Sequence, residues 1–259
     1  MRVMLEELWR SRALVAALIR RHIATRYRGS FFGFLWSFLN PLCLMGVYTL
    51  VFSHYMRVSG GPHYHLMVFA GLLPWIWTTS ALTEGTSSLV SSGHLITKSM
   101  FPAHVLPFVT VCASMVHFVL ALPVLCVFMI ASGAPITATW LLLPLLVFLH
   151  GVFLAGCVLG LSALNVFYRD VQHLLGNFLT LIFFLCPVVY PRSNIPERAR
   201  FWFDLNPFAL LTEMYQMILL EGIVPSTGQL LYIAGVSCAA LAIGVAVHQG
   251  CREQFAEAL

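Results

Sequence analysis

Six long apolar runs without a single Asp, Glu, Lys or Arg constrain this chain more than any other feature of its sequence. A helix needs about 20 predominantly apolar residues to cross the hydrocarbon core of a bilayer, and the runs are close to that length. Hydrophobic residues make up 59% of the chain and charged residues 9%, and the mean hydropathy is +0.87. Soluble domains carry about one quarter charged residues. The sequence therefore predicts an all-α integral membrane protein with six transmembrane helices, at residues 34–53, 66–82, 105–131, 140–167, 174–190 and 229–247.

Lysine and arginine predict the orientation, because cytoplasmic loops of membrane proteins carry an excess of both residues. With six spans, ten of the basic residues fall on the side of the N-terminus and four on the other side. Both termini are therefore expected in the cytoplasm. A single transmembrane domain over 1–259 is expected, made of an interfacial helix with a headgroup loop (1–29), spans one to five (30–190), an external segment (191–228), and span six with a cytoplasmic tail (229–259).

Two segments are neither span nor simple loop. Residues 3–24 place apolar side chains on one face of a helical wheel, which predicts an imperfect amphipathic helix in the cytoplasmic interface. Residues 191–228 alternate turn signals with a short apolar run, which predicts a pair of short helices dipping in from the outer face. In the fourth span, Gly151, Gly156 and Gly160 form a stripe of small residues that favours close helix contact.

Chemistry that the sequence lacks narrows the function. The six runs contain no carboxylate to serve as the relay of an ion-coupled transporter, and His117 and His150 are interpreted as hydrogen-bonded interior residues. The seven cysteines are scattered without metal-ligand or CxxC spacing, and His63 and His65 have no nearby acid or cysteine. No metal site and no catalytic set is predicted, so the chain is not expected to be an enzyme.

An ATP-binding site is also missing. A P-loop needs Gly before its Lys, whereas Thr97 precedes Lys98, the only lysine. If the protein moves cargo uphill, a separate subunit must bind ATP and Mg²⁺. The loop 83–104 and its amphipathic piece from Leu95 to Phe101 could dock such a subunit, although an ordinary linker fits the composition as well.

The stretch RYRGS at 26–30 carries the most specific signal for binding. Ser30 is a good N-cap candidate for a helix that begins near Phe31, and free N–H groups at a helix start attract anions. Arg26 and Arg28 precede this cap and Tyr27 adds a hydroxyl, which is typical of a phosphate cradle at headgroup depth. The two arginines could equally be topology determinants. The aromatic residues that follow predict either a sugar-stacking lining or an interface belt; they are Phe31, Phe32, Phe34, Trp36 and Phe38.

Four segments in register carry a family resemblance. They are RYRGSFFGFLWSFLNPL (26–42), KSMFPAHVLP (98–107), FYRDVQHLLGNFL (167–179) and CPVVYPRSNIPERARFWFDLNPF (186–208). Together they resemble the permeases of type-2 ABC exporters of cell-surface polysaccharides such as O-antigen, capsule and teichoic acid. The resemblance implies a six-span homodimer in the bacterial inner membrane, with a channel at the dimer interface and two copies of an ATP-binding subunit. The implied cargo is a glycan on a polyprenyl diphosphate or another lipid.

The resemblance also implies roles for particular residues. The lipid diphosphate would be held by Arg26, Tyr27, Arg28, Gly29 and Ser30. The channel entrance would be lined by Phe31, Phe34, Trp36 and Phe38. Coupling to the ATPase would run through 92–104, with Leu95, Lys98, Phe101 and Pro102. The external gate would lie in 193–220, with Arg198, Trp202, Asn206 and Pro207.

Two other functions stay open from the sequence. A related permease could export a small molecule or drug, although such chains generally lack RYRGS together with the YRD loop. A membrane transferase acting on polyprenyl-phosphate sugars would need carboxylates at the cytoplasmic surface, where Glu84 and Asp170 are the candidates outside the termini.

Overall fold

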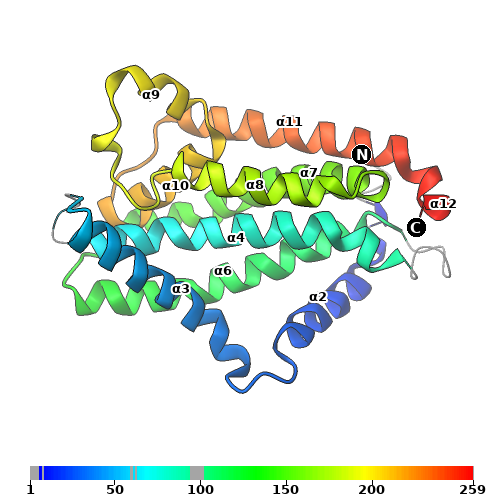
Figure 1. Ribbon diagram of the computed structural model, residues 1–259, viewed down its shortest axis with the longest axis horizontal. Helices are drawn as coiled ribbons and strands as arrows, with labels where there is room; N and C mark the ends of the chain where they lie inside the picture. The colour runs from blue at the N-terminus through cyan, green and yellow to red at the C-terminus, as the bar shows by residue number, and fades with distance from the viewer. Residues whose placement is uncertain (1–5, 8, 59–60, 62, 94–101, 259) are drawn as a thin grey trace.

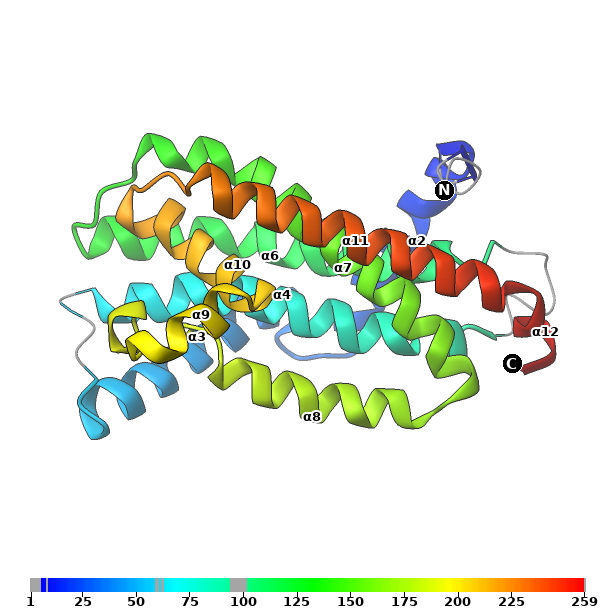
Figure 2. The same ribbon diagram turned by 90° about the horizontal axis from the view of Figure 1, so that it is seen from above.

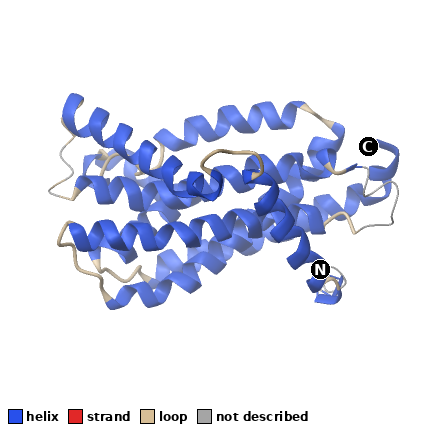
Figure 3. Ribbon diagram, turned by 90° about the horizontal axis from the view of Figure 1, so that it is seen from below, coloured by secondary structure: helices blue, strands red, loops and turns tan. Residues whose placement is uncertain are grey.

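The computed structural model describes residues 6–7, 9–58, 61, 63–93 and 102–258, and the chain is helical in all of its longer elements, with no strand in this described part (Figure 3). This confirms the predicted all-α class. The elements, in chain order, are α2 (Arg12–Tyr27), η1 (Gly33–Leu35), α3 (Trp36–Tyr48), η2 (Thr49–Tyr55), α4 (Tyr64–Ser91), α6 (Val105–Ala131), η3 (Ala138–Leu142), α7 (Leu143–Phe167), α8 (Asp170–Phe184), η4 (Arg192–Asn194), α9 (Glu197–Asp204), α10 (Pro207–Gln216), η5 (Met217–Glu221), α11 (Thr227–Cys251), η6 (Arg252–Gln254) and α12 (Phe255–Ala258).

Five helices among the described residues are long and apolar enough to cross a membrane. They span Gly33–Tyr55, Tyr64–Ser91, Val105–Ala131, Ala138–Phe167 and Thr227–Gln254. Each contains one of the predicted runs, because an uninterrupted apolar run of this length can satisfy its backbone polar groups in lipid only as a helix.

Two predicted boundaries are wrong. The second helix does not end at residue 82 but continues to Ser91, so Glu84 lies inside α4 rather than beyond it. The run 174–190 is not one helix, since α8 ends at Phe184 and a turn follows. Pro187 explains this end, because proline has no N–H to donate to the helix. The Pro187 carbonyl instead accepts a hydrogen bond from Gln216 Nε2 at 2.7 Å.

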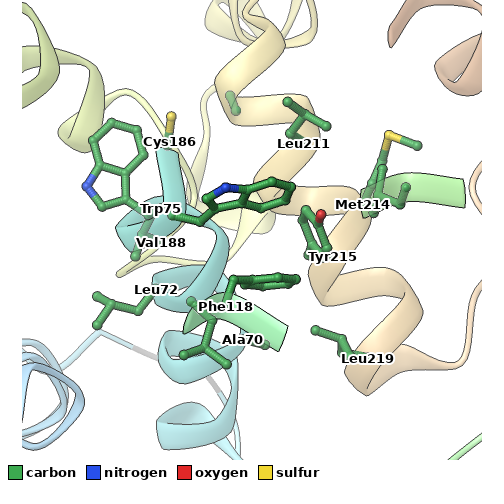
Figure 4. Close-up of a cluster of buried hydrophobic side chains, with 14 of the residues drawn as sticks. Ala70, Leu72, Trp75, Phe118, Cys186, Val188, Leu211, Met214, Tyr215 and Leu219 are labelled. Atoms are coloured by element: carbon green, nitrogen blue, oxygen red, sulfur yellow. The ribbon is translucent and has the colours of Figure 1, made fainter. Parts of the chain in front are cut away.

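Helix α4 is the centre of the molecule and contacts α3, α6, α7, α8 and α10. In Figure 2 it runs through the middle of the bundle, with α8 and α3 on one side and α7 and α11 on the other. Figure 4 shows how the core forms where α4 and α6 meet the segments around Cys186 and Tyr215. Of the 18-residue membrane window in α4, 72% is buried, against 11% in Gly33–Tyr55. Helix α3 therefore presents most of its apolar surface outward.

Helices α7 and α11 approach each other closely at glycines. A Cβ atom on Gly156 would clash with the backbone of Ala240 and Leu241, and one on Gly244 would clash with the backbone of Gly156. The predicted close contact at Gly156 is confirmed, and Gly160 lies beside Gly244 as well. Gly151 is different, because a Cβ there would make only ordinary contact with Trp77.

Two interior histidines pair with hydroxyl groups on other helices. His150 is 1% exposed, and its Nε2 lies 3.0 Å from Thr78 Oγ1 while its Nδ1 lies 3.4 Å from Tyr215 Oη. His117 Nδ1 lies 3.3 Å from Ser37 Oγ. These contacts confirm the interpretation of both histidines as hydrogen-bonded interior residues. The seven cysteines are all free, and two of them, Cys43 and Cys238, are exposed on helix surfaces rather than packed.

The flanking elements lie at the two ends of the bundle. Helix α12 is at one end in Figure 1, and α9 is at the opposite end. Val15, Leu18 and Ile19 of helix α2 pack on Val105 and Val109 at the start of α6. The predicted pair of short helices in 191–228 is present as α9 and α10.

Candidate functional site: the loop between α2 and α3

The candidate binding residues fall on the end of α2 and on the loop that follows it. Arg26 and Tyr27 are the last two residues of α2, and Arg28 is its C-cap. Gly29 has a φ of +81°, a conformation that glycine adopts without the strain of a Cβ, and it turns the chain from α2 toward α3. The side chain of Tyr27 lies outside the described atoms. The loop is short, because α2 ends at Tyr27 and η1 begins at Gly33.

The prediction that Ser30 caps a helix is wrong. The next helix begins three residues later, as η1 at Gly33, with Phe32 in the N-cap position and without a side-chain cap. The Ser30 carbonyl, not its hydroxyl, takes part, accepting a hydrogen bond from Gly33 N at 3.2 Å. The helix begins only after Phe31 and Phe32, and the N–H groups of Gly33 and Leu35 donate to the carbonyls of Ser30 and Phe32. They are therefore not the free N–H groups predicted beside Ser30.

The two arginines have different surroundings. Arg26 Nη1 donates to Glu84 Oε1 at 2.8 Å, across from α2 to α4. His22, one turn earlier on α2, places Nε2 3.0 Å from the other Glu84 oxygen. Arg28 is exposed and makes no ion pair within the described part of the chain. Arg28 is therefore available to an anion, whereas Arg26 is held by a carboxylate.

Glu84 is a site residue that the sequence reading missed. From the sequence, Glu84 is expected just past the second span (66–82), with a possible role only as the acid of a transferase. A signal was present, since Glu84 is the only acidic residue between Glu7 and Asp170. A lone carboxylate beside a bilayer is costly unless a cation pairs with it. That requirement alone could have pointed to a partner among the arginines at 20–28.

Two cavities flank the ion pair. One, of about 280 Å³, lies between α3, α4 and α6 and has Arg26, Ser37, Asn40, Ser80 and His117 in its lining. The other, of about 370 Å³, lies between α2, α4 and α6. Its polar lining consists of Arg21, His22, Thr25, Glu84, Ser87, Ser88, Ser91, Ser92 and Thr110. Both cavities offer hydroxyl and basic groups to a polar headgroup, and the first also offers the amide of Asn40.

The aromatic residues form two groups around the start of α3, and in the first group Phe31 packs edge to face on Phe32 with ring centroids 5.1 Å apart. Phe32 and Trp36 meet edge to face with ring centroids 5.6 Å apart, and Phe34 and Phe38 do the same at 5.5 Å. Only Trp36 lines the cavity that contains Arg26. Phe31 projects from the loop and is 95% exposed. The predicted aromatic set is thus split between two faces of the helix.

The predicted coupling residues lie mostly beyond the described part. Leu95, Lys98 and Phe101 are outside the described residues, and Pro102 is half-buried. The residues directly after it are anchored, because Ala103 packs in a cluster with Leu89 and with Phe255 of α12. Burial lowers the pKa of His104, although the carboxylate of Glu7 lies 3.7 Å from its Nε2.

At the opposite end of the bundle, the four predicted gate residues have different surroundings. Trp202 and Asn206 line an apolar cavity of about 580 Å³ together with Tyr190 and Ile195, whereas Arg198 is exposed. Asn206 is the N-cap of α10, where its Oδ1 accepts a hydrogen bond from Phe208 N at 3.1 Å. Pro207 occupies the first helical position, where its missing N–H costs nothing.

Replacing Asn206 by alanine will lower the free energy of unfolding by about 1 kcal/mol, because α10 loses its N-cap. Thermal unfolding of the purified protein in detergent measures the change. Asn206→Asp keeps an acceptor at the same place and serves as the matched control. Equal unfolding temperatures for Asn206→Ala and the native protein would contradict the capping role.

Arg192 is the second residue that sequence reading missed. Its Nη2 donates to Asp204 Oδ1 at 2.6 Å, and its Nη1 donates to Glu213 Oε2. The guanidinium also lies 5.7 Å from the ring centroid of Phe203. One side chain thereby ties the segment before α9 to both α9 and α10. The sequence showed only three arginines in the segment, without indicating which one meets the acids.

No group of three His, Cys, Asp or Glu side chains that could hold a metal ion is present among the residues the structure describes. His63 and His65 lie with ring centroids 6.5 Å apart, and His65 Nε2 is 3.0 Å from Ser132 Oγ.

Comparison with known proteins identifies the family to which this chain is similar. The model of the ABC-2 type transporter family matches residues 13–220. The chain is 40% identical over 258 residues to the O-antigen export system permease protein RfbA of Myxococcus xanthus, covering 99% of both chains. It is 29% identical to a protein of the same name from Klebsiella pneumoniae, covering 95% of both, and 21% identical to the polysialic acid transport protein KpsM of Escherichia coli, covering 91% of this chain and 92% of KpsM. With five long apolar helices, of which α4 is the most buried, and a family match over most of its length, this chain is a membrane protein that belongs to the ABC-2 type transporter family.

Proposed function

We propose that this chain is the membrane subunit of an ATP-driven exporter that moves a lipid-linked polysaccharide, such as an O-antigen or capsular glycan, across the bacterial inner membrane. The observation that carries the proposal is the 40% identity, over 99% of both chains, to a protein named as an O-antigen export permease. No other class of transporter is favoured by a specific observation. Two copies of a separate subunit would bind ATP and Mg²⁺ and supply the work.

The topology of the proposed exporter has six crossings. Helix α8 has 15 residues, which span about 22 Å at 1.5 Å per residue, and the turn over 185–190 would complete this crossing, the fifth in chain order. Helix α12 and α9 lie at opposite ends of the bundle, which suits a cytoplasmic C-terminus and external short helices. The segment 92–104 would then face the ATPase, and α9 and α10 would close the outer mouth.

The channel would form between two copies of the chain. Helices α3 and α8 lie on the same side of the bundle in Figure 2, and both present apolar side chains outward. Tyr48 of α3 meets Phe183 of α8 with ring centroids 5.4 Å apart, so the two helices form one continuous face. A second copy on this face would enclose a passage whose entrance carries Phe31, Phe34, Trp36 and Phe38.

The headgroup loop would take the diphosphate of the cargo. Arg28 is exposed at the head of the loop, and Arg26 lies two residues before it, at the end of α2. An arginine can bind phosphate oxygens through two parallel N–H donors, which a lysine cannot do. Gly29 and Ser30 would leave room for the phosphates, since a Cβ built on Gly29 meets nothing within 4 Å.

The test reverses one charge. In cells that depend on this exporter, Arg28→Glu will lower surface polysaccharide at least about tenfold, because the loss of a charge-assisted contact and a new repulsion weaken phosphate binding by more than 1.4 kcal/mol. Membrane level and co-purification with the ATPase subunit should stay unchanged.

The matched control is Arg20→Glu, which reverses an exposed arginine on α2 away from the loop. Surface polysaccharide, measured by immunoblot, should be normal in this variant. Normal surface polysaccharide in Arg28→Glu would contradict the proposal that the loop binds the diphosphate of the cargo.

A further inference from the structure

The contact between Arg26 and Glu84 has a consequence for how cargo binds. The two side chains are 37% and 34% exposed, and His22 is 31% exposed. Ion pairs at this degree of exposure contribute little net stability, because water competes for both partners. A ligand with a stronger anionic group can therefore replace the carboxylate. A phosphate that binds Arg26 would have to take the position that the Glu84 carboxylate occupies.

Geometry places Glu84 at a junction. Arg26 lines the cavity beside α3, while His22 and Glu84 line the cavity beside α2. One carboxylate oxygen of Glu84 contacts Arg26 and the other contacts His22, both on α2. The ion pair thus lies between the two cavities and joins α2 to α4. Any anion that binds Arg26 from the cavity side competes with Glu84 for the same guanidinium.

Helix α4 connects this junction to the far segment. Glu84 is seven residues before Ser91, the last residue of α4, and α4 leads into 92–104. Apart from this pair, α2 is held mainly through Val15, Leu18 and Ile19 on α6. Release of Glu84 would free the C-terminal half of α2 from α4. Occupancy at Arg26 would in this way change the attachment of the helix that carries the predicted coupling segment.

We propose that Glu84 is an internal counter-ion for Arg26, which the diphosphate of the cargo displaces, so that Glu84 sets the affinity for cargo and reports loading to α4. This inference rests on the proposed function. It assigns to Glu84 a positioning role, since it acts through Arg26 and touches no cargo itself. In the unloaded state, Glu84 keeps Arg26 paired; in the loaded state, the phosphate takes its place.

The experiment measures binding to the permease reconstituted with its ATPase subunit in uncharged lipid nanodiscs. The probe is a polyprenyl diphosphate without sugar, and the reference ligand is the corresponding uncharged polyprenol. Glu84→Gln will bind the diphosphate about two- to fivefold more tightly than the native complex, because no internal anion has to be displaced. Its ATP hydrolysis will also respond less to the probe. The matched control is Glu253→Gln, an exposed carboxylate on η6.

A double-mutant cycle separates competition at Arg26 from simple charge repulsion. In an Arg26→Gln background, Glu84→Gln should leave the diphosphate affinity unchanged, because there is no guanidinium left to release. An equal gain in both backgrounds would overturn the proposal, as would no gain in the native background. Unchanged polyprenol binding in every variant shows that the proteins are folded.

Two further measurements distinguish cargo phosphate from bilayer phosphate and test whether a diphosphate site exists at all. If phosphatidylglycerol in the nanodisc cancels the difference between Glu84→Gln and the native complex, then bilayer phosphate rather than cargo displaces Glu84, and the assignment to cargo is wrong. If the native complex does not distinguish polyprenyl diphosphate from polyprenol, the proposed diphosphate site itself fails. That outcome is distinct from a native complex that binds the diphosphate with an affinity that Glu84→Gln does not alter.

Discussion

Gly244→Val will lower the free energy of unfolding by about 3 kcal/mol and the unfolding temperature by about 6–12 °C. A Cβ at residue 244 would enter the backbone of Gly156, and a backbone cannot rotate away as a side chain can. Helices α7 and α11 would have to separate along their contact. In a membrane this loss is not offset by hydrophobic burial, because association of helices there depends on close van der Waals contact.

The matched control is Gly235→Val on the same helix. A Cβ at residue 235 meets nothing within 4 Å, so the same chemical change is made without the clash. Thermal unfolding in detergent, followed by size-exclusion chromatography, distinguishes the two variants. Equal unfolding temperatures would show that α7 and α11 can separate without cost. In that case the glycine contact would not explain how this part of the bundle is held together.

Arg192→Ala will destabilise the protein by about 2 kcal/mol and speed hydrogen exchange in α9. Removing one partner of a fully buried ion pair costs roughly 3–5 kcal/mol, and the value here is lower because the Arg192 side chain is 36% exposed. The main loss falls on Glu213, whose side chain is only 12% exposed and would keep its charge without a cation. Asp204 is 48% exposed and can be hydrated instead.

The pH dependence of this variant has a definite sign. Burial raises the pKa of Glu213, and Arg192 partly offsets that effect. Without Arg192 the pKa rises further, so the folded state binds a proton more tightly than the unfolded state does. The stability that depends on this proton is present at acid pH and is lost as the pH rises through the pKa of the folded state. The destabilisation by Arg192→Ala is therefore largest at neutral pH.

A second substitution tests the cause. Arg192→Ala combined with Glu213→Gln removes the buried charge together with its partner, and it should recover most of the lost stability. Arg198→Ala, which removes an exposed arginine from α9, is the control and should change little. If Glu213→Gln does not restore stability in the Arg192→Ala background, the ion pair is not what holds α9 to α10.

The sequence by itself determined the class of the protein, the position of five long helices and the closeness of one helix contact. Runs such as 105–131 have one solution in lipid, because unpaired backbone groups cannot be hydrated there. The glycines of 143–167 indicated a close approach, since only residues without a Cβ allow one. The four motifs in register also predicted the family that the comparison confirmed.

Only the tertiary structure decided which groups meet. Glu84 is 58 residues from Arg26 along the chain, and Glu213 is 21 residues from Arg192. No periodicity predicts contacts at such separations, because they depend on how helices cross. The ends of α4 at Ser91 and of α8 at Phe184 were also known only from the tertiary structure. Arg26 and His22 of α2 contact Glu84 in the extended part of α4, and beyond the end of α8 the carbonyl of Pro187 accepts a hydrogen bond from Gln216 of α10.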